Sequence, residues 1–339
     1  MRQTQHLKKR IQKRIIGFVA LLFLLLFFLL INLLTGSNGI NFHDLNILFD
    51  SQNNLFITQL RLPRALGAIL AGALLALSGA IMQGALKNQL ASPFTLGISQ
   101  AAAFGSSFAI IVLQAYSSDN TTISTLSVGF CAFLASMLCM LFIVLLSRVS
   151  SLSPNAMVLA GVALGSLFHS MTMFLQYFAD DMEASATLFW TFGELGKVTW
   201  NHIIMMGIVF VPVYVYFAFS HWKMDALSFG DDSAMTRGVH VTRFRFGALL
   251  LSSLLSAVAV SFLGIIGFVG LVAPHITRMI FGANHFSILV FSSFIGAILL
   301  LSADFVSKII LMPIILPIGI LTSFMGVPMF LYLLLRKGR

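Results

Sequence analysis

Long apolar runs of about 20 residues dominate the chain and alternate with short polar segments. A helix of ~20 residues crosses the hydrocarbon core of a membrane, whereas the strands of a membrane barrel alternate apolar and polar residues. The runs show no period-two alternation, so the pattern predicts an all-α polytopic membrane protein. We expect about ten spans, at residues 15–34, 63–85, 94–113, 124–147, 155–178, 200–220, 243–262, 265–282, 286–304 and 319–335.

Two of these spans allow more than one interpretation. The first follows the basic stretch "KKRIQKR" but lacks a small-residue cleavage site after it, so we interpret it as a retained helix rather than a signal peptide. Around "FLGIIGFVGLVAPHITRMIFG", glycines 264, 267 and 270 leave three possibilities open: a break, a re-entrant segment or a continuous helix.

Composition and charge agree with a membrane location. The chain is 58% hydrophobic and 9% charged, which excludes a water-soluble domain. With ten spans, 16 of the 20 Lys and Arg residues fall on one side, together with both termini. The positive-inside rule makes that side cytoplasmic, so residues 1–14 form a cytoplasmic basic N-terminus. The net charge of +9 therefore indicates membrane orientation and not nucleic-acid binding.

Small residues predict where helices approach each other. The second span carries one at every fourth position, and comparable pairs occur in the fifth and seventh spans. A substrate path lined by the same residues is the alternative. The stripe in the second span consists of Ala68, Gly72, Ala76, Ala80 and Gly84.

The stretch "QLRLPRALGA" places Arg61 and Arg64 at the entrance of the second span, on the side where basic residues are scarce. Proline at residue 63 suits the first turn of a helix, so both arginines are expected on one helix face. Either they bind a partner or they reach lipid headgroups as interfacial anchors.

Several activities lack their motifs. "GELGK" at residues 193–197 has neither the spacing nor the hydroxyl residue of a P-loop, and no hydrolase or closely spaced metal-ligand motif occurs. Cys131 and Cys139 lie about 12 Å apart along one helix, too far for a disulfide. Only His169, His275 and Asp304 are candidates for intramembrane proton transfer, and packing or helix-end roles are preferred for them.

The longest cytoplasmic segment, residues 221–245, contains "LSFGDDSAMTRGV". Acidic residues at the start of a helix are favoured by its dipole, and glycine ends helices. A short helix is therefore expected from Asp231 or Asp232 to Gly238. By composition, the segment is either a handle for another protein or a solvated connector.

Five separated motifs resemble those of the FecCD/BtuC family, which are membrane permeases of ATP-driven importers for iron-siderophores, haem and vitamin B12. They are "RLPRALGAILAGALLALSGAIMQGALKNQLASPFTLGIS", "AMVLAGVALG", "LSFGDDSAMTRGV", "GFVGLVAPHITRM" and "LPIGILTSFMGVPMFLYLLLRKGR". They occur in order from about residue 55 to the C-terminus.

The resemblance implies one transmembrane permease domain over residues 1–339, with the fold of a type II importer permease. It also implies a second permease subunit, identical or closely related, two cytoplasmic ATPase subunits and an extracytoplasmic substrate-binding protein. The chain itself would be a transport subunit and not an enzyme. No cofactor is expected in this chain, because ATP and Mg²⁺ would be bound by the partner ATPase. The membrane would be the cytoplasmic (inner) membrane of a bacterium or an archaeon.

Three sets of site residues follow from the resemblance. Docking of the binding protein falls to Arg61, Arg64 and Lys308, the last at a position where arginine is common. Coupling to the ATPase falls within residues 221–245, at Gly230, Asp231, Ala234 and Gly238. The cytoplasmic gate would comprise Ser153, Pro154 and Asn155, although the last two depart from the run of hydroxyl residues in the vitamin B12 member.

A translocation path lined by small and apolar residues would include Met171, Met173, Phe174 and Gln176, for which contact with lipid or other helices is the alternative. The substrate order is iron-siderophore, haem, cobalamin and then an oxyanion such as molybdate. Outside the family, an ion-driven secondary transporter would survive loss of the ATPase activity, and a membrane scaffold or receptor would accumulate no solute.

Overall fold

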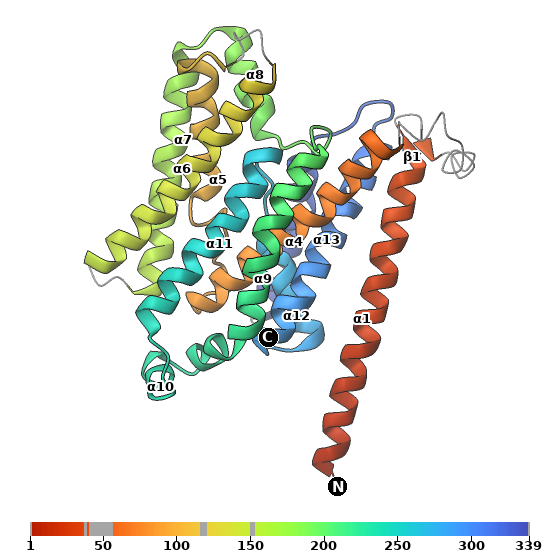
Figure 1. Cartoon of the computed structure of the whole chain (residues 1–339), viewed down its shortest axis with the longest axis vertical. Coiled ribbons are helices and arrows are strands. Elements are labelled where there is room, and N and C mark those ends of the chain that lie inside the picture. Colours follow the sequence, from red (N-terminus) through yellow and green to blue (C-terminus); the bar gives the residue numbers. More distant parts are fainter. Residues whose placement is uncertain (1, 37–38, 41–56, 116–120, 150–152, 338–339) are drawn as a thin grey trace.

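The computed structural model describes residues 2–36, 39–40, 57–115, 121–149 and 153–337, and it is helical almost throughout (Figure 1). The sheet within these ranges is a single antiparallel pair, in which Thr35 lies opposite Ile40. The all-α prediction is confirmed. In chain order the elements are α1 (Arg2–Leu34), β1 (Thr35–Gly36), β2 (Gly39–Ile40), η1 (Ile57–Arg61), α4 (Leu62–Ala85), α5 (Ile98–Ser107), η2 (Phe108–Val112), α6 (Thr121–Val149), α7 (Pro154–Phe178), α8 (Asp181–Thr191), α9 (Trp200–Ser228), α10 (Asp231–Thr236), α11 (Val241–Leu263), α12 (Val269–Phe281), α13 (His285–Ile309) and α14 (Ile318–Lys337).

The ten predicted spans correspond to ten apolar helical segments. Seven helices in the described ranges are long and apolar enough to cross a membrane, and three apolar segments are shorter. The short helix predicted in the longest cytoplasmic segment forms as α10. Helix α8 was not predicted, although it begins with a capping box in which the Asp180 carboxylate accepts from the Glu183 backbone N–H at 2.7 Å.

The glycine-rich stretch after α11 is a break. Helix α11 ends at Gly264, whose φ is 75°, and α12 starts after Phe268, whose φ is 63°. A residue other than glycine pays a steric cost at positive φ, so Phe268 marks a locally strained turn. Helix α12 has 13 residues and is about 20 Å long, which is shorter than the ~30 Å hydrocarbon core.

Helix α4 forms the centre of the bundle and packs against α9, α11, α12 and α13. In its most apolar stretch 83% of the residues are buried. A Cβ added at Gly72 would lie 2.9 Å from the Ala297 Cα on α13, and one added at Gly79 would lie 2.7 Å from the Gly270 Cα on α12. The small-residue stripe on α4 is therefore a packing seam, as predicted.

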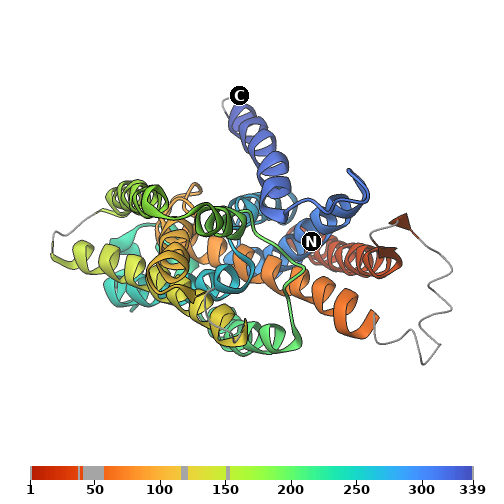
Figure 2. The same cartoon turned by 90° about the horizontal axis from the view of Figure 1, so that it is seen from above.

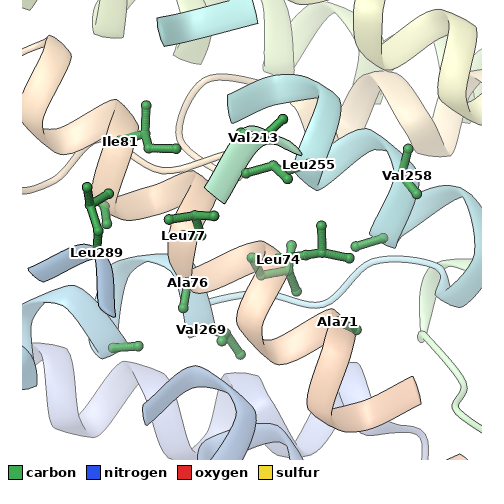
Figure 3. Packing of buried hydrophobic residues seen from close by; sticks show 14 of the residues in the cluster. Ala71, Leu74, Ala76, Leu77, Ile81, Val213, Leu255, Val258, Val269 and Leu289 are labelled. Carbon is green, nitrogen blue, oxygen red and sulfur yellow. The ribbon is translucent and has the colours of Figure 1, made fainter. Parts of the chain in front are cut away.

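Apolar side chains complete this core on the other sides of α4. Figure 3 shows the arrangement, with residues from five helices in one cluster: Ala71, Leu74, Ala76, Leu77 and Ile81 of α4, Val213 of α9, Leu255 and Val258 of α11, Val269 of α12 and Leu289 of α13.

The first helix is the least embedded of the long apolar helices described, and the last helix projects from the bundle (Figure 2). Only 6% of the most apolar stretch of α1 is buried, and this helix lies mainly along α13. Figure 2 shows α14 projecting away from the rest of the bundle. Both helices therefore leave apolar surface outside the core of this chain.

Candidate functional site

A group of charged and polar side chains joins α1, α4 and α13 at the end of the molecule that carries β1. Arg64 Nε donates to Asp304 Oδ1 at 2.9 Å, and Arg64 Nη2 lies 2.8 Å from the same oxygen. Lys308 Nζ lies 2.9 Å from Asp304 Oδ2 and donates to Asn32 Oδ1 at 2.9 Å. Together with Arg61, these residues are called the Asp304 cluster.

Burial explains why the Asp304 cluster must be paired. Asp304 is fully buried and Lys308 is 4% exposed, and a buried charge is tolerated only with a partner charge and hydrogen bonds. Asn32 adds a link to α13, because its amide donates to the Leu301 carbonyl oxygen at 2.9 Å. The predicted helix-end role of Asp304 is confirmed, since a cation faces each of its carboxylate oxygens.

The three residues assigned to docking by resemblance differ in their access to the surface. Arg61 is partly exposed and donates to the Leu33 carbonyl oxygen at the end of α1, at 2.8 Å. The side chain of Arg64 is 17% exposed, whereas that of Lys308 is 4% exposed. The two arginines therefore reach the surface, and Lys308 lies beneath it against Asp304.

The residues assigned to ATPase coupling define the shape of α10 at the opposite end of the molecule (Figure 1). Gly230 has φ 114° and Gly238 has φ 81°, so a side chain at either position would strain the backbone. Ala234 is fully buried. Asp231 is the first residue of the helix, and its carboxylate bonds to Lys87 and Arg245.

These ion pairs also set the titration of Asp231. Burial acts to raise its pKa, but hydrogen bonds from Lys87 and Arg245 outweigh burial and lower the pKa below the ordinary value of 3.8. The carboxylate is therefore ionised at neutral pH. Sequence reasoning counted Lys87 and Arg245 only as cytoplasmic charges and missed that they meet Asp231.

The predicted gate residues form the start of α7. Ser153 is the N-cap and accepts a hydrogen bond from the Ala156 backbone N–H at 3.3 Å, and Pro154 occupies the first turn. Asn155 is exposed. The structure therefore places the three predicted gate side chains at the start of a helix. The preceding residues, 150–152, lie outside the described ranges.

The predicted path residues lie on α7, but they do not share one environment. Met171, Met173 and Phe174 are exposed on the outside of this chain. Gln176 instead donates to the Thr187 hydroxyl at 2.8 Å and thereby ties α7 to α8. The first three side chains belong to a surface that this chain alone leaves uncovered.

A cleft of about 550 Å³ lies elsewhere, between α8, α14 and the break before α12. Phe94, Phe192 and Phe324 line it together with Ser323, and none of its lining side chains is ionisable. None of the predicted path residues lines this cleft. The sequence signals for this cleft are the glycine-rich break before α12 and the residues "LPIG" before α14. Nothing in the sequence indicates that these two segments lie together. Within the described residues, no three His, Cys, Asp or Glu side chains are grouped to hold a metal.

Comparison with known proteins assigns most of the chain to one family. Residues 24–336 match the FecCD transport family. The chain is 46% identical over 287 residues to a protein of Methanocaldococcus jannaschii named among ABC transporter permeases, covering 84% of this chain and 82% of that protein. It is 35% identical to the vitamin B12 import permease BtuC of Citrobacter koseri, covering 86% of each chain. It is 36% identical to the hemin transport permease HmuU of Yersinia pestis, covering 82% of each.

A solved structure agrees with this placement. It is described as an inward-facing conformation of a metal-chelate type ABC transporter, and it superposes with a TM-score of 0.83 at 30% identity, covering 94% of this chain and 98% of that one. The relatives are transport subunits and not enzymes, and ATP is hydrolysed by separate ATPase subunits. The resemblance inferred from the five motifs is confirmed: the chain belongs to the FecCD transport family and is a multi-pass permease subunit of a type II ABC importer.

Proposed function

We propose that this permease imports a metal chelate, with a ferric siderophore as the first candidate and haem and cobalamin after it. The observation that carries the proposal is the cleft of about 550 Å³ with aromatic walls and no ionisable lining side chain. Apolar and aromatic walls suit a bulky organic ligand. A small oxyanion would need donors or cations to replace its hydration, and for that reason molybdate ranks last.

We propose that the Asp304 cluster faces the outside and that Arg61 and Arg64 meet acidic groups of the binding protein. Lys308 contributes beneath them by holding Asp304. Each exposed charge pair contributes about 0.2–1 kcal/mol, so several pairs together would set the orientation of docking. The orientation is supported by the concentration of 16 of 20 basic residues on the other side, where both termini and α10 would be cytoplasmic.

We further propose the assembly implied by the resemblance: two permease subunits, two ATPase subunits that bind ATP and Mg²⁺, and one binding protein. A second permease copy would cover the outer surface of α7, which exposes Met171, Met173 and Phe174. ATP binding in the partners would move α10 and change the side to which the cavity opens. The gate at Ser153, Pro154 and Asn155 would close that route on the cytoplasmic side.

The test is uptake into sealed proteoliposomes that contain this permease and its ATPase, with binding proteins loaded in turn with ferric siderophore, haem, cobalamin or molybdate. Arg61→Glu and Arg64→Glu reverse the two docking charges. Lys197→Glu is the matched control, because Lys197 is 54% exposed and, among the described residues, its ion pair is the local one with Glu194 at 3.0 Å.

We expect accumulation of a metal chelate that depends on ATP and is abolished by Arg61→Glu together with Arg64→Glu but not by Lys197→Glu. Accumulation of molybdate in place of the chelates would contradict the substrate proposal. Uptake that is indifferent to both arginine reversals would contradict the docking proposal while leaving the substrate proposal intact.

A further inference from the structure

The side chain of Asp231 is 36% exposed, and its carboxylate is bonded to two basic side chains of its own chain. Its Oδ1 accepts from Lys87 Nζ at 2.8 Å, and Arg245 Nη2 donates to Oδ1 and Oδ2 at 3.0 Å each. The Arg245 side chain is only 15% exposed. Hydrogen bonds between charged groups are stronger than neutral ones, so the first turn of α10 is held by side chains of its own chain.

Arg245 extends this attachment to α4. Its Nε donates to the carbonyl oxygen of Ala85, the last residue of α4, at 2.9 Å. One guanidinium group therefore bonds the start of α10 and the end of α4 at the same time. Lys87 lies two residues beyond α4, in a turn where its own φ is 50°, and reaches Asp231 from the same end of that helix.

The other side of α10 is open. Met235 and Arg237 are exposed, and the Arg237 guanidinium lies 5.0 Å from the centre of the Phe229 ring, itself 69% exposed. Ala234, in contrast, is fully buried against the core. The helix thus has an outer surface free for a partner within the described part of the chain. Its inner side is bonded to Lys87, in the turn after α4, and to Arg245 of α11.

We propose that Asp231 is a positioning residue that fastens the coupling helix to α4, so that a displacement of α10 by the ATPase is passed to the helix carrying Arg61 and Arg64 at its other end. Helix α4 suits this role because it is the most buried of the long apolar helices described. Its 24 residues span about 36 Å. The inference rests on the proposed contact between α10 and the ATPase, and the bonds from α10 through Arg245 to α4 form a contiguous network of the kind that carries coupling between distant sites.

The experiment measures how far the binding protein, without ligand, stimulates ATP hydrolysis by the reconstituted permease–ATPase complex. The variants are Asp231→Asn, Lys87→Gln and the two combined. Asp232→Asn is the matched control, because it removes the same charge from the same helix turn on its exposed side. Asp231→Glu keeps the charge and tests rescue. The amount of ATPase that co-purifies with each variant reports assembly.

We expect Asp231→Asn to lower the stimulation ratio about fivefold, because it breaks the pairs with both Lys87 and Arg245. Lys87→Gln should lower the ratio less, because the Arg245 pair remains, and the combined variant should lower it no further than Asp231→Asn. Asp232→Asn should leave a larger ratio than Asp231→Asn, Asp231→Glu should recover most of the loss, and co-purification should be equal throughout.

Three results would overturn the proposal. Equal losses in Asp231→Asn and Asp232→Asn, or loss of co-purified ATPase with Asp231→Asn, would mean that the charge acts on the ATPase surface itself. Additive losses in the combined variant would mean that Asp231 and Lys87 act separately. If the binding protein does not stimulate ATP hydrolysis by the wild-type complex, the proposed function is contradicted, and this inference fails with it.

Discussion

Removing the charge of Asp304 should destabilise the permease more than removing any exposed carboxylate. Asp304→Asn keeps the size of the side chain but leaves Lys308, which is 4% exposed, without its counter-ion. Breaking a buried ion pair from one side costs about 3–5 kcal/mol. The lower end applies here, because Asn32 Oδ1 still accepts from Lys308 at 2.9 Å and Arg64 retains 17% exposure to water. We therefore expect a loss of about 3 kcal/mol.

The assay is thermal unfolding of the purified permease in detergent, in which a loss of this size should lower the midpoint by about 4 °C. Glu194→Gln is the control, because Glu194 and Lys197 are each about half exposed and their pair contributes little. Adding Lys308→Met to Asp304→Asn removes the stranded cation and should restore most of the midpoint. A midpoint for Asp304→Asn equal to that of Glu194→Gln, or a combined variant no more stable than Asp304→Asn, would refute the reasoning.

Two further predictions concern helix packing and pH. Gly79→Ala places a Cβ 2.7 Å from the Gly270 Cα and should cost about 3 kcal/mol of stability. The control, Gly207→Ala, adds a Cβ that meets nothing within 4 Å and should be neutral or stabilising. Equal unfolding midpoints for the two variants would contradict close packing along α4. Because the pKa of Asp231 is lowered below 3.8, its ion pairs persist at higher pH and are lost only as the pH falls through that lowered value. The difference in binding-protein stimulation between wild type and Asp231→Asn should therefore stay constant from about pH 6 to pH 8, and its disappearance at pH 6 would contradict the pairing.

Three residues of the motif around α10 shape this helix or attach it to its own chain. In "GDDSAM", Gly230 supplies a positive φ, Asp231 a carboxylate paired with Lys87, and Ala234 a buried methyl group. Each of these roles concerns the attachment of α10 to its own chain. The proposed contact with an ATPase would then fall to the exposed residues Met235 and Arg237, which were not among the residues assigned to coupling.

The sequence by itself determined the ten apolar helical segments and the family, although not the short helix α8. A run of about 20 apolar residues has to satisfy its backbone hydrogen bonds internally in a membrane, so length and composition suffice to predict a helix. The glycines of α10 and the small residues of α4 were also predictable, because positive φ and close helix contact are local requirements with few chemical solutions.

Only the tertiary structure decided which charges meet. Arg64 and Asp304 are 240 residues apart and Lys87 and Asp231 are 144 residues apart, yet each pair is in direct contact. A charged residue at a helix end can be satisfied by water, a headgroup, a partner or another helix, and the sequence pattern is the same in all four cases. The packing of α4 against α11 and α13 selects among them, and in doing so it buries Lys308 beneath the surface and brings Arg245 to Asp231.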